Sequence, residues 1–512
     1  MQGQSQRTKR NSRVAGALGA SALTAALLAS VAAPAAAEET LVIERVPHSR
    51  GAFGPDPRYP GSYDTKQQID IYGGKKNIDE PRPLIEAWEP MYREGPLQPN
   101  YDIVGRKNLV APAFALYGDW RTAVAYNDNG KGKRVGQIAT RLNLEADLQF
   151  TATERIHALF RPLDRNGRFT RYEFFGPDAD HRGHLEFDWV PRTFFFEGDL
   201  GNIVAGFSDR YQKWDLPFTF GLVPLIFQNG IWVNSAMAGA AFSIVGRNSP
   251  AFNISNMDFT FFGGGDQVTT PAVKDANGNL VKHGLAVYGM NVFIEANEGY
   301  WEIGGGVIHD YRNDPFGDKS YASATVAFTK RYFGWLSNSW RGIAAFGQDR
   351  QSNGKRTADG IILLMENSLI SPQPLVLVPY ANAFVGFGQP QSLMRNGDAG
   401  GVLFNTGILF QTDGLTGYPK LDDTGHYTYG GAVGVNYLFN LEQQIVLEAA
   451  TVQVHGPNDP VVRPARGAQY GLGARYQRNL TKAWLFRADV MYAWRDNQDN
   501  IAGIRAEVRQ KF

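Results

Sequence analysis

The residues best suited to chemistry are arginines that share strand-like stretches with aspartate and glutamate. A guanidinium can bind a carboxylate or a phosphate through two parallel hydrogen bonds. In a narrow passage such arginines attract anions, and neighbouring acids keep the anion from binding too tightly. We expect at least half of these side chains to pair across strands and only pack the wall. The candidates for lining a passage are Arg141, Glu145, Asp147, Arg155, Arg161, Glu186, Asp188, Arg192, Arg331, Arg475, Arg487, Asp489, Arg495, Arg505, Glu507 and Arg509.

Histidines in polar loops suggest a second kind of chemistry. His181 and His184 have the spacing H-x-x-H beside Asp178 and Asp180, a pattern that could bind a metal or serve a hydrolase. Polar loops carry histidine and aspartate by composition alone, however. The chain also has no cysteine for a thiolate metal site or a haem attachment. We therefore expect no enzymatic activity, no metal and no cofactor.

Strands with one apolar and one polar face must position the charged residues. In GQIATRLNLEADLQF (136–150), the even positions are apolar except for Thr140, whereas the odd positions carry Arg141, Glu145 and Asp147. The last residues, IAGIRAEVRQKF (501–512), alternate in the same way. Further alternating stretches are HLEFDW (184–189), YASATVAFTKRY (321–332), HYTYGGAVGVNYLF (426–439), AQYGLGARYQR (468–478) and TKAWLFRADVMYAWRD (481–496).

This pattern predicts an all-β fold, and specifically a transmembrane antiparallel β-barrel. The segments are roughly 9 to 14 residues long, which suits tilted membrane strands. Trp484 and Trp494 bracket one of them, as aromatic girdles do at membrane interfaces. We count about 18 strands, because an even number is expected for bacterial barrels. A large soluble β-sandwich or propeller is the alternative, but the chain lacks a propeller repeat of about 40 to 50 residues.

The first 37 residues have the pattern of a secretory signal peptide. Four basic residues and no acid precede a run of small apolar residues that closes on Ala35-Ala36-Ala37. The whole chain has a net charge of +1, from 51 basic and 50 acidic residues, which argues against a nucleic-acid partner. We divide the chain into a signal peptide (1–37), a proline-rich extension that is periplasmic or lies in the lumen (38–106), and the barrel (107–512). The alternative for the extension is a disordered arm.

Three stretches do not follow the simple alternation. The extension contains one short amphipathic piece, PLIEAWEPMYRE (83–94). Residues 210–235 form either an inward-folded constriction loop or an ordinary surface loop. In 387–426 we expect a strand, GVLFNTGILFQ (401–411), with long connections on both sides. Either the strand count is off there or a long loop lies on the periplasmic side, where short turns are the rule.

The chain resembles the alginate-export family of outer-membrane porins. The features that carry the resemblance are the signal peptide, the strand count, the arginine-rich polar faces, the terminal Phe512 and the order EGDLGNIVAGFSDRYQKWDLPFTFGLVPLIFQNGIWV (197–233). It covers roughly residues 107–512, and the extension (38–106) departs from it. The terminal phenylalanine also resembles the signal that the outer-membrane assembly machinery reads. The resemblance implies passive export of an anionic polysaccharide.

These observations lead us to expect a porin of the bacterial outer membrane that passes a hydrophilic, anionic solute or polysaccharide by diffusion. Its expected partners are outer-membrane lipid and lipopolysaccharide, the assembly machinery and periplasmic proteins. A second class stays open, in which the barrel is a sheath or scaffold for a secretion or electron-transfer complex and partner proteins fill its lumen. An outer-membrane enzyme is a more distant alternative.

Overall fold

The computed structural model describes residues 81–88 and 101–512, except positions 131, 166, 178, 276–277, 313–316, 350–354, 371–375, 412–413 and 441. The predicted signal peptide and most of the predicted extension lie outside the described residues. The chain divides into two compact units, 1–78 and 79–512, and the description below concerns the second.

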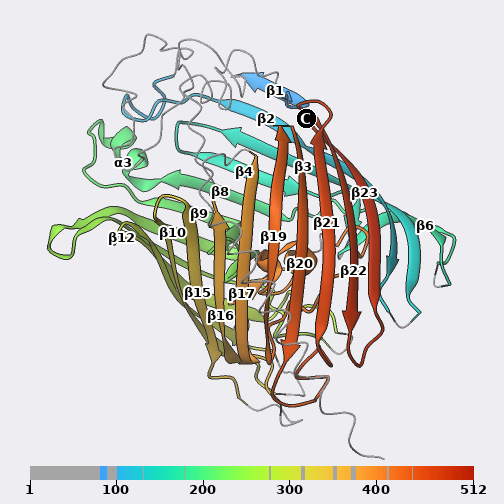
Figure 1. Ribbon diagram of the computed structural model, residues 1–512. Coiled ribbons are helices and arrows are strands. Elements are labelled where there is room, and N and C mark those ends of the chain that lie inside the picture. The colour runs from blue at the N-terminus through green and yellow to red at the C-terminus, as the bar shows by residue number, and fades with distance from the viewer. Residues whose placement is uncertain are drawn as a thin grey trace, which may run out of the picture. The chain divides into compact units, whose positions relative to one another are not determined.

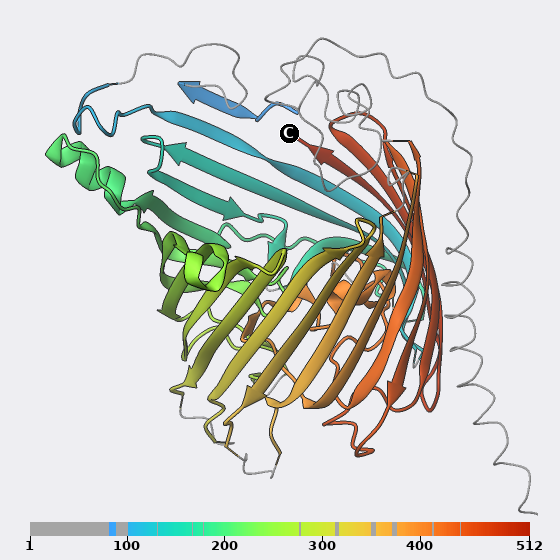
Figure 2. The ribbon, with the colours of Figure 1, turned by 60° about the vertical axis from the view of Figure 1, so that its left-hand side comes forward.

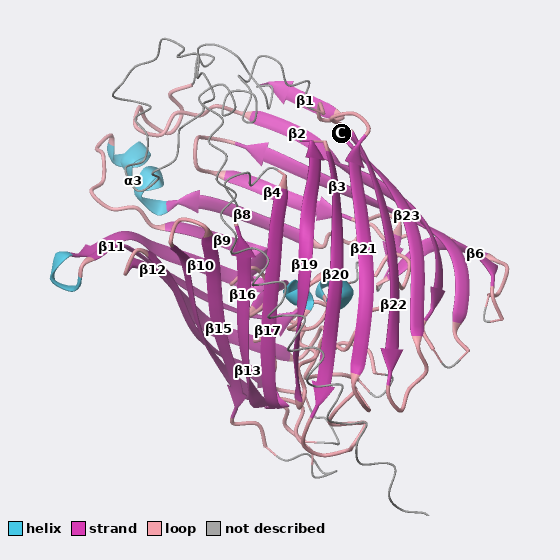
Figure 3. Ribbon diagram, in the orientation of Figure 1, coloured by secondary structure: helices cyan, strands magenta, loops and turns pink. Residues whose placement is uncertain are grey.

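Antiparallel strands make up most of this unit, as Figures 1 and 3 show. The helices are α3 (Leu200–Ser208) and the 3-10 turns η2 (Pro250–Phe252), η3 (Gly397–Ala399), η4 (Phe404–Thr406) and η5 (Ile408–Phe410). The strands are β1 (Ile85–Trp88), β2 (Ala113–Asp128), β3 (Arg134–Gln149), β4 (Arg155–Phe160), β5 (Asp164–Arg165), β6 (Arg168–Phe175), β7 (Gly183–His184), β8 (Thr193–Asp199), β9 (Pro217–Phe227), β10 (Val233–Ser249), β11 (Ile254–Gly265), β12 (Leu285–Ala296), β13 (Gly299–Asp310), β14 (Tyr321–Tyr332), β15 (Leu336–Phe346), β16 (Asp359–Leu369), β17 (Leu377–Gln389), β18 (Met394–Arg395), β19 (Thr428–Asn440), β20 (Gln443–Val454), β21 (Gln469–Asn479), β22 (Trp484–Arg495) and β23 (Ile501–Lys511).

The strands close into a barrel of 18 within the described part of the chain. Two of the 18 strands are interrupted. The first consists of β4 and β6, which both pair with β3. The second consists of β7, which pairs with β6, and β8, which pairs with β4. The ring closes where β2 pairs antiparallel with β23. At this seam Phe512 and Gly118 exchange backbone hydrogen bonds of 2.8 and 3.1 Å. The prediction of an all-β barrel with about 18 strands is confirmed.

Part of the predicted extension also joins the sheet. β1 pairs with the first four residues of β2, beyond the point where β23 stops. It covers four residues of the amphipathic piece predicted at 83–94.

The predicted strand faces are confirmed by burial and register. On β3, Leu144 pairs with Phe160 on the outward face, while its neighbours Asn143 and Glu145 point inward. Large apolar side chains are exposed on the outward face all around the ring, including Trp120, Phe220, Tyr288, Leu363, Leu447, Leu472, Val490 and Ile504. Among the described residues, no helix is long and apolar enough to cross a membrane.

Most short turns lie at one end of the barrel and most long loops at the other, although the β8–β9 connection with α3 (200–216) lies at the end with the short turns. We call these ends the turn end, which also holds Phe512, and the loop end. The longest connection, between β17 and β19, lies at the loop end. For the stretch 387–426, the alternative of a long loop on the same side as the short turns is therefore wrong.

This longest connection, residues 390–427, folds into the barrel, and we call it the plug. Its short helical turns lie within the ring of strands in both Figure 1 and Figure 2. Leu393, Leu403, Leu409 and Phe410 are buried against inward-facing side chains of the wall. The strand predicted at 401–411 is wrong, since these residues form η4 and η5. They are apolar because the plug is enclosed, not because one face meets lipid.

The tip of the β9–β10 hairpin also turns inward. Residues 217–227 are strand β9, but Gln228, Ile231 and Trp232 at the tip are buried. The Trp232 ring N–H donates to the inward-facing Ser323 hydroxyl at 3.0 Å. A side chain at Gly304 would strike that ring, so glycine is required there. Of the two interpretations of 210–235, the constriction loop holds for the tip alone.

Candidate functional site

The plug is attached to the wall and to the inward hairpin tip by buried polar side chains. β18 pairs parallel with the start of β10. The Arg395 guanidinium donates to the carbonyls of Gly230, Ala399 and Gly400, the last two at 2.6 Å. Burial lowers the pKa of Arg395 to about 10, which still leaves it charged at neutral pH. This arginine therefore holds the plug in place and does not face a solute.

A second attachment lies on β20. The inward-facing Glu448 carboxylate accepts the backbone N–H groups of Ile408 and Leu409, each at 2.8 Å, and the Tyr380 hydroxyl. Gly407 packs directly on this carboxylate, where a side chain would collide with it. Glu448 thus caps the N–H groups at the start of η5 that have no partner within the helix, as an acid does at a helix N-terminus.

Beside the plug, charged residues of five neighbouring strands form one inner surface, which we call the arginine wall. Arg141, Arg121 and Arg509 stand directly opposite one another across β3, β2 and β23. In the row containing Arg505, Asp489 and Arg475 face it across β22 and β21. Like charges placed opposite each other destabilise a sheet, so a row of three arginines needs compensating acids.

Four acids supply that compensation. Glu507 accepts two hydrogen bonds from Arg121, at 2.9 and 2.8 Å, and also pairs with Arg505. Asp489 bonds Arg475 and Arg487, each at 2.7 Å. Asp119 lies 3.0 Å from Arg509, and Asp398 of the plug lies 3.6 Å from Arg141 and 3.0 Å from Arg161. Seven arginines thus share four acids within the described residues, which leaves positive charge in excess.

Access to the wall falls towards the loop end, where the plug covers it. The Arg505 side chain is 1% exposed, whereas Arg487 is 20% and Arg509 36% exposed. Arg141 is only 7% exposed: it lies 3.6 Å from Asp398 of the plug, and its guanidinium is 5.5 Å from the ring centre of Phe169 on β6. A solute entering from the turn end would therefore meet Arg509 and Arg487 first.

Closer to the turn end the inner surface becomes acidic. His157 lies 3.6 Å from both Glu145 and Asp147. Arg155 pairs with Glu197 and lies 3.6 Å from Asp147. The predicted Glu145, Asp147 and Arg155 thus belong to a group separate from the arginine wall.

A cavity of about 1020 Å³ lies between the plug, the β11–β12 loop and the interrupted strands. Among its lining residues are five cations and five acids: Arg161, Arg165, Arg168, Arg192, Lys282, Asp164, Glu186, Asp188, Asp275 and Asp398. Four of the predicted residues, Arg161, Glu186, Asp188 and Arg192, thus come together here. The strand predicted at 184–189 is paired only at its first residue, yet its faces are as predicted, because Glu186 and Asp188 line the cavity and Leu185, Phe187 and Trp189 are exposed.

Two predicted residues lie apart from both groups. Arg331 is on β14, opposite Ser337 of β15 and far around the ring from the arginine wall. Arg495 ends β22 at the loop end, where its Nε donates to the Asp499 carbonyl at 2.7 Å.

Sequence reasoning missed Asp119, Arg121, Arg165, Arg168 and Asp398. The first two alternate with the outward Trp120 in AFALYGDWRTAVAYND, so the same period-two rule could have found them. The hairpin that carries Arg165 and Arg168 has an Asn-Gly turn signal at 166–167. Asp398 had no signal, because its position depends on how the plug folds.

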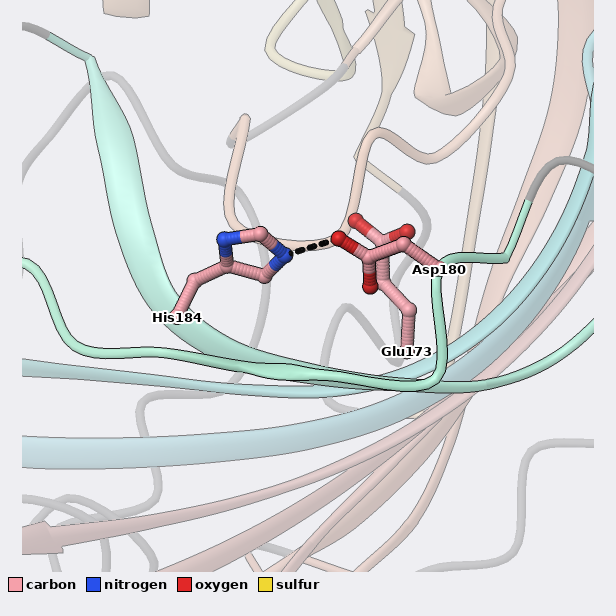
Figure 4. Close-up of side chains that lie close together, drawn as sticks. All are labelled: Glu173, Asp180 and His184. Atoms are coloured by element: carbon pink, nitrogen blue, oxygen red, sulfur yellow. Dashed lines mark hydrogen bonds and ion pairs between the residues drawn. The ribbon is translucent and has the colours of Figure 1, made fainter.

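The histidine pattern gives only a small acidic group. Ligand atoms of Glu173, Asp180 and His184 lie within 4.8 Å of one another. Figure 4 shows the His184 ring pointing towards the Asp180 carboxylate, with Glu173 beside it. His184 Nε2 and Asp180 Oδ2 already share a hydrogen bond of 2.5 Å, and Arg171 pairs with Glu173 at 2.7 Å. These contacts link β6, β7 and the connection between them.

No family model and no curated protein matches the chain. Among solved structures, it is similar to Pseudomonas aeruginosa OccK8 (OprE), at 9% identity over 78% of this chain and 98% of that one, with a TM-score of 0.49. It is also similar to P. aeruginosa OccK2 (OpdF) in complex with glucuronate, at 12% identity over 78% and 98%, with a TM-score of 0.47. A third is Escherichia coli Wzi, a carbohydrate-binding β-barrel involved in group 1 capsule assembly, at 12% identity over 77% and 85%, with a TM-score of 0.42. The resemblance to the alginate-export family stays a prediction.

The location of the protein follows from its own strand pairing and surface. The antiparallel ring closes between β2 and β23 and leaves only part of β9 without a partner on one edge, and its exterior carries exposed aromatic and aliphatic side chains throughout. Only a barrel of this kind can place strands in lipid with every backbone group bonded. The chain is a β-barrel of the bacterial outer membrane, as predicted from the alternating strands.

Proposed function

We propose that the barrel is an outer-membrane channel that passes hydrophilic anions along the arginine wall. The observation that carries the proposal is the row of Arg141, Arg121 and Arg509, which the fold keeps in register although like charges repel. The mechanism is diffusion. Guanidinium groups replace part of the hydration of a carboxylate or phosphate, and the acids between them limit how tightly it binds.

The plug favours a channel over a sheath for partner proteins. Apolar side chains of the chain itself, such as Leu403 and Phe410, already fill the centre of the lumen against the wall. A partner protein would have to displace this packing, whereas a small anion needs only a passage beside it. An anionic sugar or a single extended polysaccharide chain is the solute class that we propose, in line with the resemblance noted from sequence.

Ion selectivity in a planar bilayer tests the proposal. Under a KCl gradient, the reversal potential of the wild type should show preference for chloride, and Arg487→Gln and Arg509→Gln should each reduce it. The preference should also weaken with salt, since the screening length falls from about 10 Å at 0.1 M to about 3 Å at 1 M.

Arg478→Gln is the matched control for this measurement. It removes the same charge from β21 at an exposed position opposite the outward-facing Phe486, so it should leave selectivity unchanged. A wild type that prefers potassium, or variants of the wall that behave like the control, would contradict the proposal.

A further inference from the structure

The barrel wall is incomplete on one edge of β9. β8 pairs with β9 only as far as Phe194, which faces Leu222. From Val223 to Phe227, β9 pairs with β10 alone, and the hairpin tip then turns into the lumen. The wall therefore lacks strand pairing beyond Leu222.

The segment Leu185–Arg192 forms the other edge of this gap. It is attached only on the side away from β9: the Asp188 N–H donates to the Pro162 carbonyl at 3.1 Å, and the Arg192 N–H to the Leu159 carbonyl at 2.7 Å. Within the described residues, no backbone hydrogen bond joins this segment to β9. We call the gap the window.

The 1020 Å³ cavity lies at the window and reaches both of its edges. Val190 and Pro191 line it on one edge, and Leu222 and Ala236 on the other. The last two alternate with buried inward residues such as Val223, so they belong to the outward rows of β9 and β10. The cavity therefore opens through the wall towards its outer surface.

Two arginines that have no ion-pair partner among the described residues line this cavity. Arg165 and Arg168 face each other across the β5–β6 hairpin, and both are exposed. Neither makes an ion pair or hydrogen bond within the described residues. Nearby Asp164 is already neutralised by Arg192, whose Nη2 lies 3.2 Å from its Oδ1. Asp188 also lies 3.7 Å from Arg192 Nη2 and accepts the Val190 N–H at 2.9 Å. Cross-strand partners lie on the same face of a hairpin, and guanidinium groups bind phosphate oxygens through paired hydrogen bonds, so this pair suits an anion such as phosphate.

The rim of the window is apolar and faces outward. Leu185 is 76% and Trp189 54% exposed, with Phe187 between them. The Trp189 ring packs on Phe160, at 6.1 Å between ring centres, and Phe160 faces outward beside Leu144. The rim is thus continuous with the surface that meets lipid.

We propose that the window binds a phosphate-bearing lipid from the side of the barrel. Its phosphate lies between Arg165 and Arg168, and its acyl chains lie on Leu185, Phe187 and Trp189. The Glu186 carboxylate, which also lines the cavity, accepts hydrogen bonds from hydroxyl or ammonium groups of the head group. This site does not depend on whether the barrel conducts ions.

A lipid-quenching experiment tests this site on the full-length protein in vesicles. Because the chain has no cysteine, a fluorophore can be attached to Val190→Cys alone. Phosphatidylcholine vesicles would contain either spin-labelled phosphatidylglycerol or spin-labelled phosphatidylcholine as the quencher. We expect the phosphatidylglycerol quencher to be enriched at this probe on the order of tenfold, which corresponds to about 1.4 kcal/mol.

Controls separate the site from general attraction of an anionic lipid. A probe at Val490→Cys, on the exposed outward face of β22, should be quenched equally by both lipids. Arg165→Gln with Arg168→Gln should abolish the enrichment at Val190→Cys, whereas Arg466→Gln with Arg478→Gln, which removes two exposed charges elsewhere, should preserve it. Heat-modifiable migration in gels verifies that each variant is folded.

Three results would overturn the proposal. The first is equal quenching of the Val190→Cys probe by the two lipids. The second is enrichment that survives loss of both arginines. The third is displacement of phosphatidylglycerol by an equal concentration of inorganic phosphate, which would mean that the cavity binds free phosphate and not a lipid.

Discussion

Pairing and exposure decide which single residues can act on a solute. Arg505 is almost fully buried between Glu507 and Asp489, so it holds the two acids in place and has little contact with the lumen. Removing it would take one buried partner from each acid, although Glu507 keeps Arg121 and Asp489 keeps Arg475 and Arg487. Arg509 is paired with one acid and is one-third exposed. Selectivity therefore depends on the exposed members of the wall and stability on the buried ones.

The two faces of β3 can be tested with one substitution at neighbouring positions. Leu144→Arg places a charge on the lipid-facing surface and should lower the free energy of unfolding by roughly 2–4 kcal/mol at the bilayer midplane. Asn143→Arg is the matched control, because Asn143 points inward and lies 3.0 Å from the Asp119 carboxylate. Denaturant unfolding in phospholipid vesicles, followed by tryptophan fluorescence, measures both. Equal losses at the two positions would mean that the faces are wrongly assigned.

For a single residue, the sequence predicts to which face of the strand its side chain points, but not which residue it pairs with. Alternation alone correctly predicted that Arg141, Arg475 and Glu507 point inward, since side chains on a strand have a period of two. It could not show that Arg121 pairs with Glu507, because these residues meet only when the first and last barrel strands close the ring. The charges and the excess of arginine over acid were therefore predicted, and the pairing between them was not.

Among the elements, the plug departs most from the pattern of the strands. GVLFNTGILFQ reads as a strand because it is apolar and short, but a segment buried on all sides needs no polar face. Its backbone groups are satisfied by the 3-10 turns and by side chains of the wall, Glu448 above all. Periodicity cannot distinguish such an enclosed segment from a strand.

Loosening this attachment should open the channel. Glu448→Ala leaves the Ile408 and Leu409 N–H groups without an acceptor, at a typical cost of 1–3 kcal/mol for each buried group. We expect the plug to leave its place more often, which would raise single-channel conductance and speed liposome swelling in sugar solutions.

Glu442→Ala is the control for the plug. It removes the same side chain from the short β19–β20 connection at the turn end, where the residue is exposed. Conductance should match the wild type. If Glu448→Ala behaves like this control while the protein stays folded, the plug does not limit passage.

For the whole molecule, closure of the ring is the condition for every other property. Each strand forms backbone hydrogen bonds with the neighbour on either side. In lipid an open edge would leave several backbone N–H and C=O groups unpaired, each at a cost of a few kcal/mol. The interrupted strands β4–β6 and β7–β8 relax this condition over a short stretch, and that is where the window lies. The fold class was predictable because alternation is repeated along the chain, whereas the window was not, since it depends on missing pairs.

The seam between β2 and β23 can be tested with a disulfide. Val124 and Ala506 are directly opposite on the outward face. They belong to the same alternating set as the hydrogen-bonded pair Gly118 and Phe512, so their Cα atoms should be about 5.5 Å apart, within the range that a disulfide needs.

Val124→Cys with Ala506→Cys should form a crosslink on mild oxidation of the folded protein. The crosslinked barrel should resist heat unfolding more than its reduced form, because a long loop closed in the unfolded state typically adds 2–4 kcal/mol. The mismatched pair Val124→Cys with Val433→Cys, on β19, should not crosslink within one molecule. Equal crosslinking of both pairs, or none in either, would show that β2 and β23 do not meet and that the ring is open.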